Sequence, residues 1–198
     1  MKKTTKYHHG NLRKELIKVG IELLDEGGIE SVGIRQVARK AGVAHSSPAN
    51  HFKNKRALFT ALATEIFQDL LTAIQTKCRT DNESLRDSVH QFSKIILDFG
   101  LQYPNRYKLT CRTDCVDRED SALYDAMERV YQHLTTILQE YAKRKSIDVE
   151  SQAIALWSLV HGYVSLRLEG ILVSGQDTIT GTDRQAAIID VIIDGLLQ

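Results

Sequence analysis

A glycine turn between two short helical segments, within residues 31–55, restricts the fold of this chain more than any other feature. From Ile34 to Ala41, apolar residues recur three, four and seven positions apart, which places them on one face of an α-helix. Gly42 follows as a stop, and a second helix of about two turns fits between His45 and His51. Two short helices joined by a tight glycine turn are typical of a helix-turn-helix unit.

The second predicted helix is too short and too polar to be a core element. Pro48 lies early in it, where a missing N–H costs little. The exposed side chains are hydrogen-bond donors and acceptors, which suit base edges and phosphates. A corner of an ordinary helical bundle has the same pattern, so the surrounding charge has to distinguish the two interpretations. The candidate contacts are His45, Ser46, Ser47, Asn50 and His51.

The charge of the chain is unevenly distributed. Residues 1–56 carry 12 Lys and Arg against 5 Asp and Glu, a net charge of +7, whereas residues 57–198 carry 14 against 20, a net charge of −6. A concentrated basic region is the electrostatic footprint of a protein that binds a polyanion. We therefore interpret the glycine-turn segment as a DNA-binding unit.

Residues 11–62 resemble the DNA-binding domain of the TetR family of bacterial transcriptional regulators. The spacing from Val37 through Gly42 to Lys55 fixes two helices, their turn and the start of the next helix together. The residues that carry the resemblance are Leu12, Leu16, Leu23, Leu24, Gly27, Gly28, Ile34, Arg35, Val37, Ala38, Ala41, Gly42, Val43, His51, Phe52, Lys55 and Leu58.

The resemblance implies roles for single residues. Arg35 would reach a base or a phosphate, and Lys55, at the start of a helix capped by Asn54, would contact a phosphate oxygen. Two positions depart from the family pattern. Ala44 replaces a Ser that favours helix capping, and Ala49 replaces an aromatic residue, often a phosphate-contacting Tyr. Ala44 still belongs to the predicted DNA-contacting set.

The N-terminus is predicted to be a basic arm, residues 1–10, whose lysines either approach the DNA or remain in a solvated tail. The adjacent His8 and His9 lack partner ligands, so no metal is expected there. Asn11 suits the N-cap of a first helix, Leu12–Glu26, which stops at two glycines.

Length and composition favour an all-α protein with a sizeable core. The 198 residues contain two prolines, long helical periodicities and no alternating strand pattern. We find neither a run of 18 apolar residues nor the apolar core of a signal peptide, so the cytoplasm is the expected location. The three cysteines, Cys78, Cys111 and Cys115, contain no CxxC pair, which fits a reducing compartment. Cys111 and Cys115, four residues apart, could sense electrophiles or bind a soft metal, but no third ligand is apparent.

A long helix, Lys55–Lys77, is predicted to join the two parts of the chain. At about 1.5 Å per residue it would be roughly 30 Å long. A ligand at its far end could therefore shift the DNA-binding unit at its near end. We divide the chain into a basic arm (1–10), a helix-turn-helix DNA-binding domain (11–56) and a ligand-binding and dimerisation domain (57–198).

The remaining periodicities bring the total to about nine helices, with loops at 114–120 and 174–182. A helix capped by Ser84 runs through Phe99 and is ended by Gly100, and a further short helix opens at 103–107. The later helices are expected over Ser121–Lys145, Val149–Val173 and Arg184–Leu197.

The last predicted helix is apolar over most of its circumference. One apolar face can pack on the rest of the C-terminal domain. The remaining apolar surface of the helix is most simply covered by a second copy of the chain. A single buried central helix is the alternative. In TetR-like proteins the last two long helices pair with their symmetry mates as a four-helix bundle, so the resemblance implies a homodimer.

The C-terminal part resembles the family's WHG-type domain, because Trp157, His161 and Gly162 occur in that order. Trp157 and His161 share a helix face. Pockets between bundle helices are apolar with few polar groups, so these rings and others could line an effector pocket. Ordinary core packing is the alternative for the aromatic residues. The predicted lining is Phe92, Tyr103, Tyr107, Tyr131, Trp157 and His161.

Together these features predict a ligand-responsive DNA-binding transcriptional repressor. Its dimer would place two reading helices in successive major grooves of a palindromic operator, about 34–36 Å apart. A small-molecule effector would favour a state with the wrong spacing and release the DNA. An activator of the same family and a helical protein-interaction module are the alternatives. Neither an enzyme nor a cofactor is expected, since no catalytic set, metal-ligand cluster or phosphate loop has informative spacing.

Overall fold

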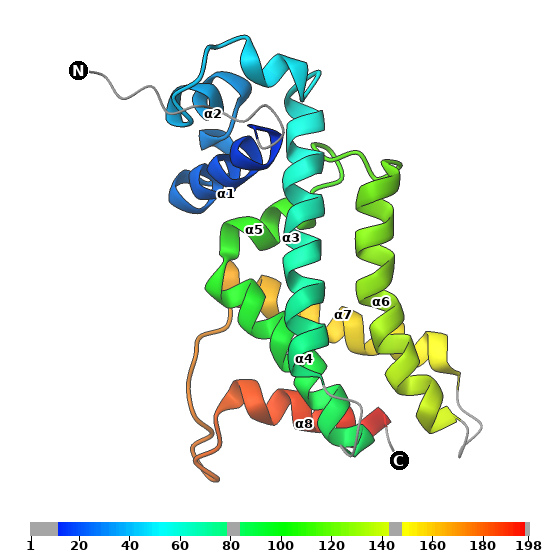
Figure 1. Cartoon of the computed structure of the whole chain (residues 1–198). Coiled ribbons are helices and arrows are strands. Elements are labelled where there is room, and N and C mark those ends of the chain that lie inside the picture. Colours follow the sequence, from blue (N-terminus) through cyan, green and yellow to red (C-terminus); the bar gives the residue numbers. More distant parts are fainter. Residues whose placement is uncertain (1–11, 79–83, 143–147, 197–198) are drawn as a thin grey trace. The chain divides into compact units, whose positions relative to one another are not determined.

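The computed structural model describes residues 12–78, 84–142 and 148–196 (Figure 1). Over these ranges the chain forms eight α-helices and one 3-10 helix, with an isolated β-bridge between Gln176 and Asp183. The all-α prediction is confirmed. The basic arm, the histidine pair at 8–9, the Asn11 cap, and the predicted helical residues 143–145 and 197 lie outside the described residues.

The chain divides into two compact units. The first takes in the chain up to Phe67 together with Asn105–Tyr124, and the second consists of Gln68–Pro104 together with the chain from Asp125 onwards. Two helices, α3 (Lys55–Lys77) and α6 (Ser121–Ala142), begin in the first unit and end in the second. The functional boundary between residues 56 and 57 stays a prediction.

Helix α1 (Leu12–Ser31) is broken at the predicted glycine stop. Gly28 has φ 71° and ψ −170°, a backbone conformation that L side chains rarely adopt. The last turn beyond the break is closed by the Ser31 hydroxyl, which donates to the carbonyls of Leu23 and Gly28 at 2.5 and 2.7 Å. The predicted helix Leu12–Glu26 matches the part before the break.

Gly28→Ala is expected to lower the free energy of unfolding by about 1–2 kcal/mol, because a side chain there is forced into the left-handed region. Gly162→Ala is the control, since an added Cβ at that helical position meets nothing within 4 Å. Chemical denaturation measures both variants. Equal stability of Gly28→Ala and the native protein would contradict the assigned conformation.

The helix-turn-helix segment has a shorter second helix than predicted. Helix α2 (Ile34–Lys40) ends two residues before Gly42, which has φ 68°. Beyond it, only Ser47–Asn50 form a helix, the 3-10 helix η1. The predicted two-turn helix over 45–51 is therefore wrong. Pro48 explains the difference, because it lacks an N–H and its ring disfavours the α conformation for the preceding residue.

Helix α3 has the predicted bounds, Lys55–Lys77. Its cap is also confirmed, because Asn54 Oδ1 accepts a hydrogen bond from the Ala57 N–H at 2.8 Å. The helix is long and apolar enough to cross a membrane, but 56% of its most apolar window is buried inside the protein. We therefore interpret α3 as a core helix.

Two predicted helix ends in the second unit are wrong. Helix α4 (Leu85–Gln102), capped by Ser84 as predicted, continues through a buried Gly100. It stops before Pro104, which disfavours helical geometry in the residue before it. Helix α7 (Val149–Leu168) is followed by Gly170 with φ 73°, so it ends before the predicted Val173.

The remaining helices follow the predicted segments closely. The short helix α5 covers Pro104–Thr110, and α8 covers Arg184–Leu196. Helix α8 packs on α4 and α7 through buried Ile189 and Ile193. Polar contacts also hold it to α4, where Arg86 pairs with Asp190 and Asp194. One face of α8 is thus used within the unit.

Candidate DNA-binding surface and ligand-binding region

The turn before η1 and η1 itself present polar side chains to solvent. Ala44, His45, Ser46 and Asn50 are exposed, whereas Ser47 and His51 are half-buried. Pro48 is buried beneath them. Successive hydrogen bonds of the 3-10 type hold the segment, including Ser47 N–H to the Ala44 carbonyl at 2.9 Å and His51 N–H to the Pro48 carbonyl at 2.9 Å. The predicted contact residues therefore lie on one short, anchored segment.

The predicted cationic contacts flank this segment on two other helices. Arg35 is exposed on α2, and Lys55 is exposed in the first turn of α3. The Lys55 ammonium lies 5.1 Å from the centroid of the Phe59 ring. Sequence reasoning missed Arg39 and Lys53, which are also exposed. Only the net positive charge of residues 1–56 pointed to them.

Not every basic residue of this unit is available for a partner. Lys40 donates to Glu26 Oε1 at 2.6 Å and lies 3.7 Å from Glu22 Oε2. The hydrogen bond to Glu26 is the main cause that raises the pKa of Lys40. Arg13 lies 5.6 Å from the centroid of the Phe52 ring. These two side chains fasten α2 and Phe52, two residues after η1, to α1.

Helix α5 and the loop after it belong to the same unit as the helix-turn-helix segment. Arg106 makes a two-pronged contact with the Asp25 carboxylate, at 2.9 Å and 2.6 Å, and Asn105 donates to the Asp25 carbonyl at 3.2 Å. The Asp117 N–H donates to the buried hydroxyl of Thr60 at 2.9 Å. These contacts between distant residues attach the segment to α1 and α3, and sequence reasoning missed them.

Four of the six residues predicted to line an effector pocket meet in the second unit. The Trp157 ring centroid lies 6.5 Å from Phe92, 6.2 Å from Tyr131 and 4.6 Å from His161. A fifth ring, missed from the sequence, is His133, which stacks on Phe92 with centroids 6.4 Å apart and planes at 14°. We call Phe92, Tyr131, His133, Trp157 and His161 the aromatic cluster; it joins α4, α6 and α7.

Burial keeps the two imidazoles of the aromatic cluster neutral. It lowers the pKa of His161 to about 4 and also lowers the pKa of His133. Tyr131 donates to Glu150 Oε1 at 3.0 Å, and its pKa is raised, first by burial and then by this carboxylate. The ring residues themselves therefore carry no charge near neutral pH.

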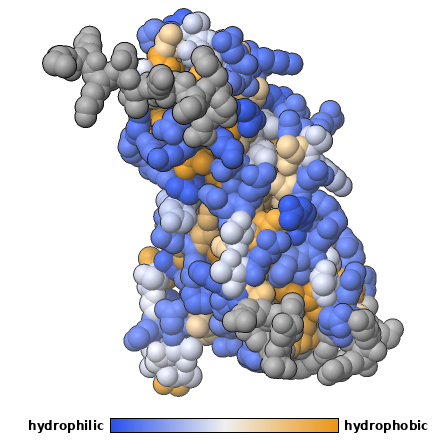
Figure 2. Space-filling view, in the orientation of Figure 1, coloured by the Kyte–Doolittle hydropathy of each residue, from blue (hydrophilic) through white to orange (hydrophobic). Residues whose placement is uncertain are grey.

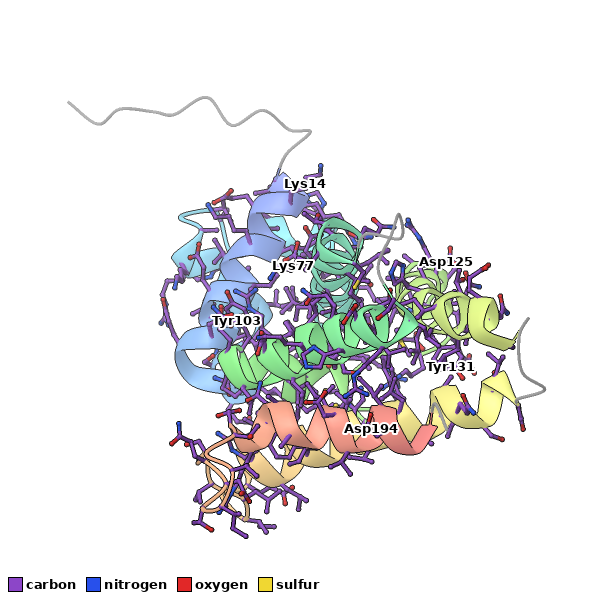
Figure 3. All side chains as sticks on the ribbon, turned by 90° about the horizontal axis from the view of Figure 1, so that it is seen from below. Lys14, Lys77, Tyr103, Asp125, Tyr131 and Asp194 are labelled. Atoms are coloured by element: carbon purple, nitrogen blue, oxygen red, sulfur yellow. The ribbon has the colours of Figure 1, made fainter. Side chains whose placement is uncertain are left out.

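The other two predicted lining residues lie elsewhere. Tyr103, at the C-terminal end of α4, contacts Phe99 and is far from Tyr131 in Figure 3. Tyr107 is buried in the first unit, with 4% of its surface exposed. Sequence reasoning could not separate these two residues from the aromatic cluster, because aromatic residues fill cores and pockets alike.

An apolar hollow of about 1180 Å³ lies between α7, the loop after it and α8. Helix residues that line it include Leu159, Leu166 and Val191, which are 44%, 38% and 72% exposed. The loop is held by Asp177, whose carboxylate accepts backbone N–H bonds from Ile179 and Thr180 at 2.9 and 2.7 Å. Figure 2 shows apolar surface at the tip of this loop. The second face of α8 is thus apolar, and the described residues leave it uncovered.

Burial outweighs the nearby positive charges at Cys111 and Cys115, so the pKa of both thiols is raised. Cys111 is exposed and Cys115 is half-buried, and both are free thiols. Partial burial is the first cause that raises the pKa of each, and Asp114 adds to it for Cys115. Over the described ranges, no group of three or more His, Cys, Asp or Glu side chains could hold a metal ion.

Two family models match the chain. Residues 16–62 match "Bacterial regulatory proteins, tetR family", and residues 89–189, about half of the chain, match "Tetracyclin repressor-like, C-terminal domain". Tetracycline repressor protein class D of Escherichia coli is 29% identical over 124 residues, which cover 62% of this chain and 53% of that protein. The chain therefore spans about half the length of the curated relatives that it matches.

Solved structures share the fold over nearly the whole chain. A Rhodococcus protein of unknown function has a TM-score of 0.76 at 22% identity, covering 98% of this chain and 97% of that one. The Bacillus subtilis regulator FadR, solved with stearoyl-CoA, has a TM-score of 0.71 at 13% identity, covering 93% and 97%. The helix-turn-helix segment, the helical C-terminal part and both family models lead to one conclusion: the chain belongs to the TetR family of bacterial regulatory proteins.

Proposed function

We propose that this protein is a cytoplasmic transcriptional repressor that binds a palindromic operator as a homodimer and is released by a small-molecule effector. The observation that carries the proposal is the anchored segment Ala44–Asn50, which exposes hydrogen-bonding side chains within a unit of net positive charge. Such a surface suits phosphates and base edges. No enzymatic step is part of the proposal.

The second face of α8 supports the dimer. Val191 and Leu159 leave a large apolar area in water, and a second copy of the same face would cover it by twofold symmetry. A dimer also places two reading segments on one DNA duplex. Their separation then has to match the spacing of the two half-sites.

The family relationship supports an effector, since the C-terminal model is described as tetracyclin repressor-like and a structural neighbour was solved with stearoyl-CoA. In this chain the effector would bind at the aromatic cluster. It would release DNA by preferring a dimer state in which the reading segments are wrongly spaced.

Lys55→Ala tests the DNA-binding surface. We expect weaker binding to all sequences and a salt dependence that is less steep by about one unit of slope, because one phosphate contact is lost. Electrophoretic mobility shifts at several salt concentrations, with an operator selected from random DNA, measure both quantities. Lys77→Ala is the matched control, since Lys77 is an exposed lysine at the other end of the same helix. An effect of equal size in the two variants would contradict the assigned surface.

His45→Ala and Asn50→Ala should instead change which bases are tolerated. Both side chains are exposed on the reading segment and can hydrogen-bond to base edges. Each variant is expected to lose about 1–3 kcal/mol of discrimination at one base pair. Selection from random DNA with each variant measures this change. Unchanged base preferences in both variants would assign base reading to other residues.

A further inference from the structure

Several buried polar atoms in and beside the aromatic cluster have no hydrogen-bond partner. His133 Nε2 is buried without a hydrogen-bond partner, although its ring stacks on Phe92. Ser93, which follows Phe92 on α4, is fully buried with its hydroxyl unpaired, and the buried Gln152 Oε1 on α7 is also unpaired. A buried polar group without a partner costs about 1–3 kcal/mol. Apolar side chains at these places would avoid that cost.

The same cluster has no ring residue that could neutralise an ion. Its two imidazoles are neutral because burial lowers the pKa of both, and no neighbouring charge contributes to either shift. Tyr131 already donates to Glu150. An anion would lose its hydration here and gain no opposite charge, which is strongly unfavourable. A cation would find the carboxylate of Glu150, but this group is exposed to solvent and already accepts from Tyr131.

We propose that the aromatic cluster binds an uncharged, flat aromatic effector that carries a hydrogen-bond donor, and that His133 Nε2 accepts this hydrogen bond. The inference rests on the proposed function, since it names the chemical class of the effector. Ring-to-ring contacts with Phe92 and Trp157 provide the apolar part of recognition, at about 0.5–1.5 kcal/mol for each ring pair. The hydrogen bond to His133 separates aromatic amides and phenols from plain hydrocarbons.

Four probes of similar size test the charge and the hydrogen bond separately. Benzamide is neutral with donors, toluene is neutral without them, benzoate is an anion and benzylamine is a cation. Trp157 is the single tryptophan of the chain and lies in the cluster, so its fluorescence reports binding to the full-length protein. We expect benzamide to bind at least about tenfold more tightly than either ion.

His133→Phe keeps a flat ring against Phe92 and removes the acceptor. It should weaken benzamide binding about tenfold and leave toluene binding unchanged. His90→Phe is the control, because His90 is half-buried on α4 and is not part of the aromatic cluster. A larger loss in His133→Phe than in His90→Phe supports the assignment.

Three results would overturn the inference: equal binding of the ions and benzamide, unchanged benzamide binding in His133→Phe, or no binding of any probe at millimolar concentration. The last result would mean that the unpaired atoms are satisfied by buried water. Operator binding, measured by mobility shift on the same preparations, separates a failure of this inference from a failure of the proposed function. A protein that binds its selected operator but fails the probe test keeps the proposed function, whereas a failure to select any operator contradicts the proposed function itself.

Discussion

Val191→Asp should convert the proposed dimer into single chains and lower operator affinity by about a hundredfold or more, because binding of the second half-site is no longer intramolecular. Val191 is 72% exposed on α8 and lines the apolar hollow. If a second copy covers this apolar face, a carboxylate there would be desolvated without a partner. Because the side chain is exposed within the chain, the substitution should leave the fold of each subunit intact.

Sedimentation velocity measures the dimer, and mobility shift with the selected operator measures affinity. Gln139→Asp is the control, since it introduces the same charge at an exposed position of α6. It should leave both measurements unchanged. A Val191→Asp protein that still sediments as a dimer at the same concentration would show that another surface joins the subunits.

Acidification from pH 6.5 to 4 should destabilise the protein by about 3 kcal/mol through His161 alone. Burial lowers the pKa of His161 to about 4, whereas the ordinary value is 6.5. Between pH 4 and 6.5, His161 is mostly protonated in the unfolded chain and mostly neutral in the folded protein. The contribution is therefore fully present above pH 6.5 and is lost as the pH falls towards 4.

Urea unfolding of the native protein and of His161→Phe, monitored by circular dichroism at several pH values, isolates the contribution of His161 to stability. Between pH 6.5 and 4, the free energy of unfolding of the variant should fall by about 3 kcal/mol less than that of the native protein. His45→Gln, which removes an exposed imidazole, is the control variant. Parallel pH profiles for all three proteins would contradict the neutral, buried imidazole.

Local sequence rules predicted the framework well where one residue decides the geometry. Gly28 and Gly42 break or end helices in the left-handed conformation, and Asn54 caps α3. The same rules failed where two local signals compete. The rules tolerate Pro48 early in a helix, yet the segment forms only a 3-10 helix of four residues. They predict a helix stop at Gly100, yet this residue is buried within α4.

Contacts between distant segments could not be predicted from patterns in one sequence. His133 has no motif around it, and its place in the aromatic cluster depends on how α4, α6 and α7 pack. The contact of Arg106 with Asp25 joins residues 81 positions apart. For the same reason the sequence pattern wrongly predicts Tyr107 among the effector-lining residues, although it belongs to the other unit.

The attachment of α5 has a consequence for recombining domains among relatives. The DNA-binding unit is discontinuous along the chain, since Asn105–Tyr124 completes it through Arg106 and Asp117. An N-terminal fragment that stops within α3 would leave Asp25 and the buried Thr60 hydroxyl without these partners. A chimaera that exchanges only the first 67 residues would pair Asp25 and Thr60 with residues of another protein. To keep these contacts, a chimaera has to exchange both segments of the unit.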